Sequence, residues 1–486
     1  MYSTRQRSHM LLILLVTLLS GAPSAHAIGG YLRWSFNSSN AYFPYNAPFA
    51  PAILRGNAPG AERVVTLNVN NEQWEVTALD IVSGQPVWNA LFPGNAVDTY
   101  PSGVTTGTEF NHFKENPQNL AMIQMGPTIV ALDGDTGAVS WQWQVPDNVT
   151  VTGMSSWGDT IALLAQGEPI QSPYFPTPTT PTVLYAIDAA SGNTRWVQNA
   201  TTILPQTQAE AATYAVECFV AGEDSLFYSR ANKLAAVNKD GSVAWKTSVS
   251  LEGSVGTGQG ANITHLIYIP RKDDADKPVS PRILANANNW SFQRFVLLSL
   301  NDTNSSAPAT PLWRSRIPET AMENLFYTQP VVDPWTNRGM FYYWSNRTDW
   351  STGSDIPSWK VMLVGRDLSN GLEMWTQTAI PVGLPSVFEG RVMVVTADGL
   401  VAMQGASGST IWQIPGVPPT EYSYNVAPTF GNETGMLVAS RCLGPAAPNL
   451  CMYSAFQPEG AAVRLSGPSM VSIAVALLAG VLCLAF

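Results

Sequence analysis

ALDGDTGAVSW at residues 131–141 and AIDAASGNTRW at residues 186–196 follow one pattern. Each begins as a short apolar strand, passes an acidic turn that contains a glycine, and ends on tryptophan. The pattern occurs seven times, and the other copies are ALDIVSGQPVW (78–88), AVNKDGSVAW (236–245), LSLNDTNSSAPATPLW (298–313), VGRDLSNGLEMW (364–375) and AMQGASGSTIW (402–412). A unit that recurs along most of a chain predicts a repeat architecture.

The residue types of the repeat predict two antiparallel strands joined by a tight turn. The apolar residues before the acidic position suit a buried strand, as at 128–132. The Asp or Asn starts the turn, and the glycine supplies the positive φ that a tight reversal needs. The large ring of the final tryptophan can fill the space between neighbouring sheets. The acidic side chains are therefore expected to serve as turn residues and not as calcium ligands, which applies to Asp80, Asp133, Asp188 and Asp367.

The spacing of the repeats favours a β-propeller. Successive repeat tryptophans are 53, 55, 49, 68, 62 and 37 residues apart. A four-stranded blade requires about 40 to 50 residues, so most of these spacings fit one blade each, with longer loops in places. The upstream part of each unit reads as two further strands, for instance 329–333 with 339–344 and 385–389 with 391–396. Helical periodicity is nearly absent, so the sequence predicts an all-β fold.

The two ends of the chain together resemble one more blade. Residues 426–430, 436–440 and 451–456 read as its first three strands, and residues 30–36 (GYLRWSF) read as a lone final strand that carries Trp34. Pairing these ends would close the ring and remove the exposed sheet edges. We therefore predict an eight-bladed β-propeller closed by an N-terminal strand, with seven blades as the alternative.

The pattern ALD-x-x-(S/T)-G-x-x-x-W resembles the repeat of the PQQ-like, or quinoprotein alcohol dehydrogenase-like, propeller superfamily, over residues 31 to about 456. The resemblance implies the propeller fold, but members include enzymes, outer-membrane assembly lipoproteins and sensor domains, so it does not fix the activity. A dehydrogenase of this superfamily would hold pyrroloquinoline quinone (PQQ) with calcium or a lanthanide, an aspartate base and, in many members, adjacent cysteines. This chain has neither a Cys-Cys pair nor a C-x-x-C-H motif. We expect no cofactor, with PQQ and calcium as the alternative.

The N-terminus has the features of a secretory signal peptide. Arg5 and Arg7 precede an apolar run at 10–19 and the small-residue sequence Ala-His-Ala at 25–27. The run is shorter than the roughly 20 residues of a spanning helix. We expect cleavage after Ala27, which leaves residues 28–458 as the propeller.

The C-terminus has the order of a glycosylphosphatidylinositol (GPI) attachment signal. Small residues at 460–462 precede a spacer at 463–469 and an apolar tail at 470–486 that ends without basic residues. Gly460 is the expected attachment site and Ser466 the second choice, within a signal spanning 459–486. The sequence thus predicts a protein on the extracellular face of the plasma membrane; the alternative is a single C-terminal transmembrane helix.

Sequons and cysteines fit an oxidising compartment. Cys442 and Cys451 flank a turn-forming segment and are expected to form a disulfide, whereas Cys218 is expected to be a buried thiol. Nine asparagines are N-glycosylation candidates: Asn37, Asn148, Asn199, Asn262, Asn289, Asn301, Asn304, Asn346 and Asn432.

Composition and charge limit the classes of function. Charged residues are 12% of the chain, and the net charge is -10. No basic stripe is present to neutralise a phosphate backbone, so nucleic-acid binding is disfavoured. After signal removal only His112 and His265 remain, which excludes a histidine metal cluster and leaves little for a Ser-His-Asp triad. Paired catalytic carboxylates stay open, because their spacing lies in space and not along the chain.

Long loops suggest where a binding surface would lie. In a four-stranded blade, the loop between the second and third strands opens on the same face as the link to the next blade, and the chain places its extra residues there. The loops are 167–181, 346–358, the segment between the two cysteines, and the link 93–108. Rigid scaffolds commonly carry binding residues on loops, so Tyr174, Phe175 and Trp350 are the rim candidates.

The leading hypothesis is therefore a monomeric, membrane-anchored module that binds an extracellular protein or glycan without catalysis. The alternatives are a secreted quinone-dependent or hydrolytic enzyme, and a structural wall or coat component.

Overall fold

The computed structural model describes the strands and the short turns of the chain. The described residues are 31–38, 52–56, 58, 60–70, 73–92, 119–125, 128–146, 149–167, 169–170, 177–178, 182–205, 217–249, 262–270, 280–289, 292–300, 309–316, 331–333, 338–346, 359–378, 385–388, 390–396, 399–415, 429–430, 434–442 and 451–457.

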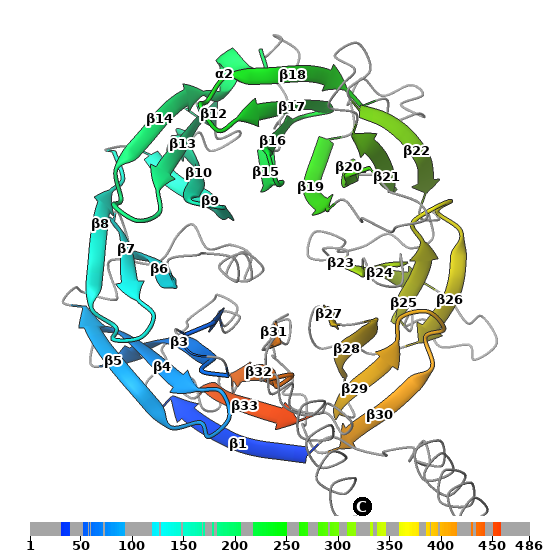
Figure 1. Ribbon diagram of the computed structural model, residues 1–486. Coiled ribbons are helices and arrows are strands. Elements are labelled where there is room, and N and C mark those ends of the chain that lie inside the picture. The colour runs from blue at the N-terminus through cyan, green and yellow to red at the C-terminus, as the bar shows by residue number, and fades with distance from the viewer. Residues whose placement is uncertain are drawn as a thin grey trace, which may run out of the picture.

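These residues form antiparallel sheets that stand around a ring (Figure 1). Seven sheets have four strands and one has three in the described part of the chain, with a two-stranded ribbon beside them. The first strand of each sheet lies nearest the centre and the last lies outermost. The all-β prediction is confirmed.

We number the sheets along the chain. Sheet 1 contains β2 (Ala52–Leu54), β3 (Arg63–Asn70), β4 (Gln73–Asp80) and β5 (Pro86–Phe92); sheet 2 contains β6 (Leu120–Met125), β7 (Thr128–Asp133) and β8 (Val139–Gln144); sheet 3 contains β9 (Val149–Trp157), β10 (Thr160–Gly167), β13 (Val183–Asp188) and β14 (Thr194–Asn199); sheet 4 contains β15 (Glu217–Ala221), β16 (Ser225–Arg230), β17 (Lys233–Asn238) and β18 (Val243–Ser248). The ribbon is β11 (Pro169–Ile170) with β12 (Thr177–Pro178).

The second half of the ring repeats this order. Sheet 5 contains β19 (Asn262–Ile269), β20 (Arg282–Asn289), β21 (Phe292–Leu300) and β22 (Ala309–Arg316); sheet 6 contains β23 (Val331–Asp333), β24 (Arg338–Asn346), β25 (Trp359–Asp367) and β26 (Glu373–Thr378); sheet 7 contains β27 (Ser386–Phe388), β28 (Arg391–Thr396), β29 (Gly399–Gln404) and β30 (Thr410–Pro415); sheet 8 contains β31 (Thr429–Phe430), β32 (Leu437–Cys442), β33 (Cys451–Gln457) and β1 (Tyr31–Ser38).

Sheet 8 joins the two ends of the chain. Strand β1 pairs antiparallel with β33, with Trp34 opposite Ala455 and Tyr31 opposite Gln457. The predicted pairing between the N-terminal strand and the last strands is therefore present. It gives β33 a partner on the side that would otherwise be a sheet edge.

The hydrophobic core is divided among the spaces between neighbouring sheets. Eight clusters of buried side chains are found in the described residues, and each joins two sheets that are neighbours in the ring. Sheets 7 and 8, for example, share a cluster that contains Leu400, Trp412 and Phe456. Each sheet thus buries both of its faces against its neighbours, as a stacked repeat must.

The one described helix is a single turn between sheets 3 and 4. Helix α2 (Ala200–Ile203) begins after Asn199, whose side-chain oxygen accepts hydrogen bonds from the Thr201 backbone N–H at 2.9 Å and hydroxyl at 2.7 Å. An asparagine is a preferred N-cap because it satisfies a backbone donor that has no helical partner.

Candidate functional site

The acidic residue of each repeat holds its own turn. The Asp188 carboxylate accepts hydrogen bonds from the Ser191 backbone N–H and hydroxyl, both at 2.8 Å, and from the Ala190 N–H at 3.1 Å. Asp80, Asp133 and Asp367 accept equivalent bonds within their turns. The predicted turn role of these four aspartates is confirmed.

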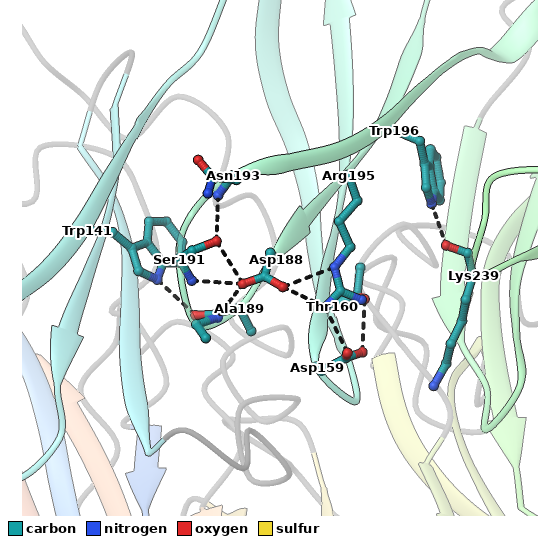
Figure 2. A network of polar contacts seen from close by, with 11 residues as sticks. Trp141, Asp159, Thr160, Asp188, Ala189, Ser191, Asn193, Arg195, Trp196 and Lys239 are labelled. Atoms are coloured by element: carbon teal, nitrogen blue, oxygen red, sulfur yellow. Dashed lines mark hydrogen bonds and ion pairs between the residues drawn. The ribbon is translucent and has the colours of Figure 1, made fainter.

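The turn of one sheet receives the tryptophan of the sheet before it. In Figure 2, Trp141 of sheet 2 points its Nε1–H at the Ala189 carbonyl oxygen in the sheet 3 turn, at 2.8 Å. The glycine of that turn, Gly192, has φ +73°, and a Cβ there would lie 2.7 Å from the ring of Trp141. The turn thus supplies an acceptor and an open surface for the indole. We call this arrangement a tryptophan dock.

In the described part of the chain, eight tryptophans occupy the repeat position on an outermost strand, and six of them are docked. The Nε1-to-oxygen distances are 2.7 to 2.9 Å, and the acceptor always follows the first residue of the turn. The pairs are Trp34 with Ile81, Trp88 with Gly134, Trp141 with Ala189, Trp196 with Lys239, Trp313 with Leu368 and Trp375 with Gly405. The prediction that these rings fill the space between sheets is confirmed, but the hydrogen bond was not foreseen.

One dock is reinforced by an arginine (Figure 2). Arg195 of β14 donates to Asp188 at 2.6 Å, to Asp159 at 2.7 Å and to the Thr160 hydroxyl at 2.7 Å. The hydrogen bond from Arg195, followed by those from Ser191, lowers the pKa of Asp188 to about 2. The hydrogen bond from Arg195 also lowers the pKa of Asp159. Both carboxylates are therefore charged at neutral pH and bound to one guanidinium, so neither is free to act as a base.

The sequence did not reveal this network. Asp159 lies in the hairpin turn between β9 and β10, and Arg195 lies next to Trp196 on the outermost strand. They meet because both turns of sheet 3 lie at the same end of its strands. The only available signal was an arginine directly before the repeat tryptophan, which the other repeat copies lack.

A second polar cluster is buried between sheets 3 and 4. Arg230 and Glu217 face each other across β15 and β16, with Nε and Oε1 3.0 Å apart and side chains 9% and 3% exposed. Burial, followed by the charge of Glu217, raises the pKa of Tyr228. On the other face of β15, against sheet 5, burial raises the pKa of the Cys218 thiol to about 12, so this free cysteine is not a reactive thiolate. The prediction for Cys218 as a buried, unreactive thiol is consistent with this environment.

The two histidines do not form a catalytic pair in the described structure. His265 lies on β19, partly buried, and its Nδ1 is 3.1 Å from the Thr264 hydroxyl. Desolvation lowers its pKa to about 4, so it is neutral at physiological pH. His112 lies outside the described residues.

The rim candidates Tyr174, Phe175 and Trp350 also lie outside the described residues, but the strands that flank their loops are described. Their two loops join the second strand of a sheet to the third, β10 to β13 and β24 to β25. The segment between the two cysteines joins β32 to β33 in the same way. All sheets are antiparallel meanders with the same strand order. The second strand of each sheet therefore ends at the same face of the ring, and these loops leave from that face. We call it the rim face and the opposite one the turn face, because the docked turns lie there.

The backbone register brings the two predicted disulfide partners together. Cys442 is directly opposite Cys451 in the β32–β33 pair. The disulfide itself stays a prediction.

Several of the candidate N-glycosylation asparagines lie at the rim face. Asn199, Asn289 and Asn346 are the last residues of β14, β20 and β24, Asn262 is the first residue of β19, and Asn37 lies near the end of β1. By strand direction these are rim-face positions. The remaining candidates lie outside the described residues: Asn148, Asn301, Asn304 and Asn432.

The acidic side chains were also compared as possible metal ligands. The described residues contain no group of three or more His, Cys, Asp or Glu side chains that could hold a metal ion. The two carboxylates of the sheet 3 turns, Asp159 and Asp188, are both bound to Arg195.

Comparison with known proteins identifies the repeat. The family model of the outer membrane protein assembly factor BamB matches residues 72–264. This segment is similar to the PQQ-like propeller repeat. The predicted resemblance to this superfamily is confirmed. The family model does not cover the repeat units after residue 264.

Solved structures that are similar to the chain share its fold. A quinohemoprotein alcohol dehydrogenase from Comamonas testosteroni has a TM-score of 0.56 at 13% identity, covering 90% of this chain and 78% of the other. The quinohemoprotein alcohol dehydrogenase ADHIIG from Pseudomonas putida HK5 has a TM-score of 0.54 at 14% identity, covering 89% and 77%. A europium-containing methanol dehydrogenase has a TM-score of 0.54 at 12% identity, covering 88% and 93%. At such identities the likeness is one of fold.

No curated protein sequence matches the chain. In the part of the chain that the structure describes, no helix is long and apolar enough to cross a membrane.

Proposed function

We propose that the protein is an eight-bladed β-propeller that acts as a binding or scaffolding module on the extracellular face of the plasma membrane. The blade count is supported by the buried clusters between neighbouring sheets and by the β1–β33 pair. The observation that carries the functional proposal is that the long loops after β10, β24 and β32 all leave from the rim face. Loops held on a rigid scaffold are a common way to build a recognition surface.

The direction of the last described strand supports the orientation of the module. Strand β33 is the third strand of its sheet and ends at Gln457 on the turn face. Gly460, the proposed GPI attachment residue, follows only three residues later. A lipid at Gly460 would hold the turn face toward the membrane and present the rim face outward. The sequons on the rim-facing ends of the strands fit this orientation, because glycans need access to solvent.

The expected partner is an extracellular protein or a glycan. Pro, Thr and aromatic residues are frequent in the rim loops, and aromatic side chains supply contact area at low entropic cost. A net charge of -10 without a basic stripe does not favour nucleic acid. We propose that the module acts as a monomer with no cofactor and no catalysis.

The first experiment tests the anchor and the rim together. The full chain is expressed in a host cell that attaches GPI lipids, and phosphatidylinositol-specific phospholipase C is added. We expect release of the protein into the medium. The released protein is then applied to a glycan array and to intact cells, and binding is compared with that of a variant with Tyr174→Ala, Phe175→Ala and Trp350→Ala.

The rim variant should bind at least about tenfold more weakly, since loss of central aromatic contacts commonly costs more than 1.4 kcal/mol. The matched control is Leu372→Ala with Met374→Ala, which removes two exposed apolar side chains (63% and 49%) at the turn-face end of β26. Equal binding by the parent and the rim variant would contradict the proposal. A rise in unfolding temperature with PQQ and calcium would instead favour the quinone-dependent alternative, because a ligand at about 100 times its dissociation constant stabilises by about 2.7 kcal/mol.

A further inference from the structure

The space between sheets 3 and 4 contains buried polar side chains beside the apolar ones. Ser155, Trp157 and Tyr228 are 4%, 1% and 0% exposed, and the Glu217 side chain is 3% exposed. One polar atom of each is buried without a hydrogen-bond partner in the part of the chain that the structure describes: Ser155 Oγ, Trp157 Nε1, Tyr228 OH and Glu217 Oε2. Buried polar groups are costly to leave unpaired, so these four atoms call for a partner.

The four side chains point into one space. Successive residues of a strand alternate between its two faces. Trp157 and Tyr228 belong to the hydrophobic cluster that sheets 3 and 4 share, and Phe219 packs against that cluster. Ser155 lies two residues before Trp157 on β9 with no bulge between them, and Glu217 lies two residues before Phe219 on β15 in the same way. Ser155 and Glu217 therefore face the same space as Trp157 and Tyr228.

The strand pairs place Ser155 and Tyr228 at a similar depth. Strands β9 and β15 are the innermost strands of neighbouring sheets and contact each other (Figure 1). Counted from the hairpin turn, Ser155 belongs to the third residue pair of β9 and β10, and Tyr228 belongs to the third residue pair of β15 and β16. Their two hydroxyls thus enter the same part of the space between the sheets.

The Glu217 carboxylate lies beside the Tyr228 hydroxyl. Glu217 Oε1 is 3.0 Å from Arg230 Nε, while its Oε2 has no partner. Burial, followed by the charge of Glu217, raises the pKa of Tyr228, so the carboxylate and the hydroxyl are near each other. Tyr228 OH nevertheless has no partner at hydrogen-bonding geometry. A water molecule commonly bridges polar groups that are close but not directly bonded.

We propose that ordered water molecules fill this space and bind the polar atoms of Ser155, Tyr228 and Glu217. The Trp157 Nε1–H is a further donor to them. The indole can only donate, the carboxylate can only accept, and the two hydroxyls can do both. Water donates and accepts, so it can serve all of these groups at once. Buried water typically makes about three hydrogen bonds to polar groups that would otherwise have none.

Two features favour water over an ion or a larger ligand. Glu217 is paired with Arg230, so the charges that border the space cancel. Ile203 of helix α2 and the adjacent Leu204 are 0% and 2% exposed and belong to the same cluster as Tyr228. Apolar side chains therefore enclose the polar ones. The water site requires neither a lipid anchor nor a partner at the rim, so it stands apart from the proposed function.

The test compares the stability of variants of the full chain by denaturant unfolding. If water is bound, Tyr228→Phe removes a paired hydroxyl and should lower the ratio of folded to unfolded protein about fivefold. Ser155→Ala should lower this ratio about threefold. Because both hydroxyls share the water, the double variant should lose less than the product of the two effects. If the space is dry, Tyr228→Phe removes an unpaired hydroxyl and raises the ratio, which would overturn the proposal.

Tyr185→Phe is the matched control. Tyr185 is 8% exposed and lies between sheets 2 and 3, where its ring centroid is 5.3 Å from that of Trp143. We expect this substitution to change the ratio less than about twofold, because the Tyr185 hydroxyl forms no hydrogen bond with the described residues. A loss equal to that of Tyr228→Phe would show that any buried tyrosine behaves in this way, and the evidence for bound water would fail.

A crystal structure of the same protein gives a second, direct measurement. We expect electron density for water within hydrogen-bonding distance of Tyr228 OH and Ser155 Oγ. If Tyr228 OH instead donates directly to Glu217, the loss from Tyr228→Phe will be independent of Ser155→Ala. That result would mean that no water is shared, and the proposal would be wrong.

Discussion

A seam is the space between two neighbouring sheets. Each seam has a tryptophan at the repeat position of an outermost strand, but in the described residues two of these tryptophans are not docked. Trp141 and Trp245 both end a repeat, and both lie on an outermost strand. Trp141 meets a turn that contains glycine and donates to its carbonyl oxygen. Trp245 faces sheet 5, where the turn sequence NDTNSSAPA at 301–309 is longer and has no glycine, and no hydrogen bond from its indole is found among the described residues. The neighbour's turn, and not the tryptophan, decides whether a dock forms.

Trp412 faces sheet 8, whose third and fourth strands, β33 and β1, come from opposite ends of the chain. A dock therefore needs residues from two successive repeats. Each repeat supplies a tryptophan ring to the sheet after it and a turn to the tryptophan of the sheet before it. The repeats must therefore keep a constant order of strand, turn and tryptophan. The following predictions test this division of roles.

The largest effect is expected from removing a docked ring. Trp141→Ala should destabilise the protein by about 3 to 5 kcal/mol, because it creates a cavity and leaves the Ala189 carbonyl without its partner. Trp245→Ala should cost about 2 kcal/mol less, since its ring is more exposed and donates no such bond. Unfolding in denaturant measures both. Equal losses would mean that burial alone, without the dock, holds the seams together.

The next largest effect is expected from changes in the turn that receives the tryptophan ring. Gly137→Ala places a Cβ 2.5 Å from the ring of Trp88 at φ +73° and should cost about 3 kcal/mol, of which about 1 kcal/mol is backbone strain. Gly60→Ala is the matched control, because Gly60 has a similar φ of +77° with no atom within 4 Å of the added Cβ. Unfolding temperatures of the two variants isolate the ring contact. If Gly60→Ala costs as much as Gly137→Ala, the close approach of the ring is unimportant.

A smaller effect isolates the hydrogen bond. Trp375→Phe keeps an aromatic ring but removes the donor 2.8 Å from the Gly405 oxygen, and should cost about 1 to 2 kcal/mol more than Trp245→Phe. Chemical denaturation of both variants, each against the parent, gives this difference. An equal cost for the two substitutions would show that water replaces the indole as the partner of Gly405.

The fold could be predicted from the sequence because the repeat is local. ALDGDTGAVSW contains its own strand, turn and outermost strand, so periodicity and turn chemistry were sufficient to identify it. The pairing of residues 30–36 with 451–456 was predictable for the same reason, since the ends supplied complementary parts of one repeat. The docks were less predictable, because the indole of Trp88 and its acceptor, Gly134, belong to different repeats.

The candidate site was the least predictable part. The Arg195 network depends on two turns of one sheet meeting at the same end, and the pair Arg230 and Glu217 depends on cross-strand register. Neither relation is visible as spacing along the chain. The rim residues Tyr174, Phe175 and Trp350 were chosen from loop length and composition, and they remain predictions.

The smallest expected effect concerns the reinforced dock of sheet 3. Because Asp188 has its pKa lowered from 3.8 to about 2, the stabilisation from its bond with Arg195 is present above pH 3.8 and is lost as the pH falls toward about 2. Arg195→Ala should therefore lower stability at neutral pH, by less than about 1 kcal/mol since the side chains are partly exposed, and the difference from the parent should shrink as the pH falls through about 2. In carboxyl NMR titration of the variant, the pKa of Asp188 should move back up toward 3.8. Lys246→Ala is the control, because that lysine donates to the Thr202 carbonyl oxygen and not to a carboxylate. If Asp188 titrates at the same pH in both variants, its turn hydrogen bonds from Ser191 lower its pKa without the arginine, and the dock of sheet 3 is no different from the others.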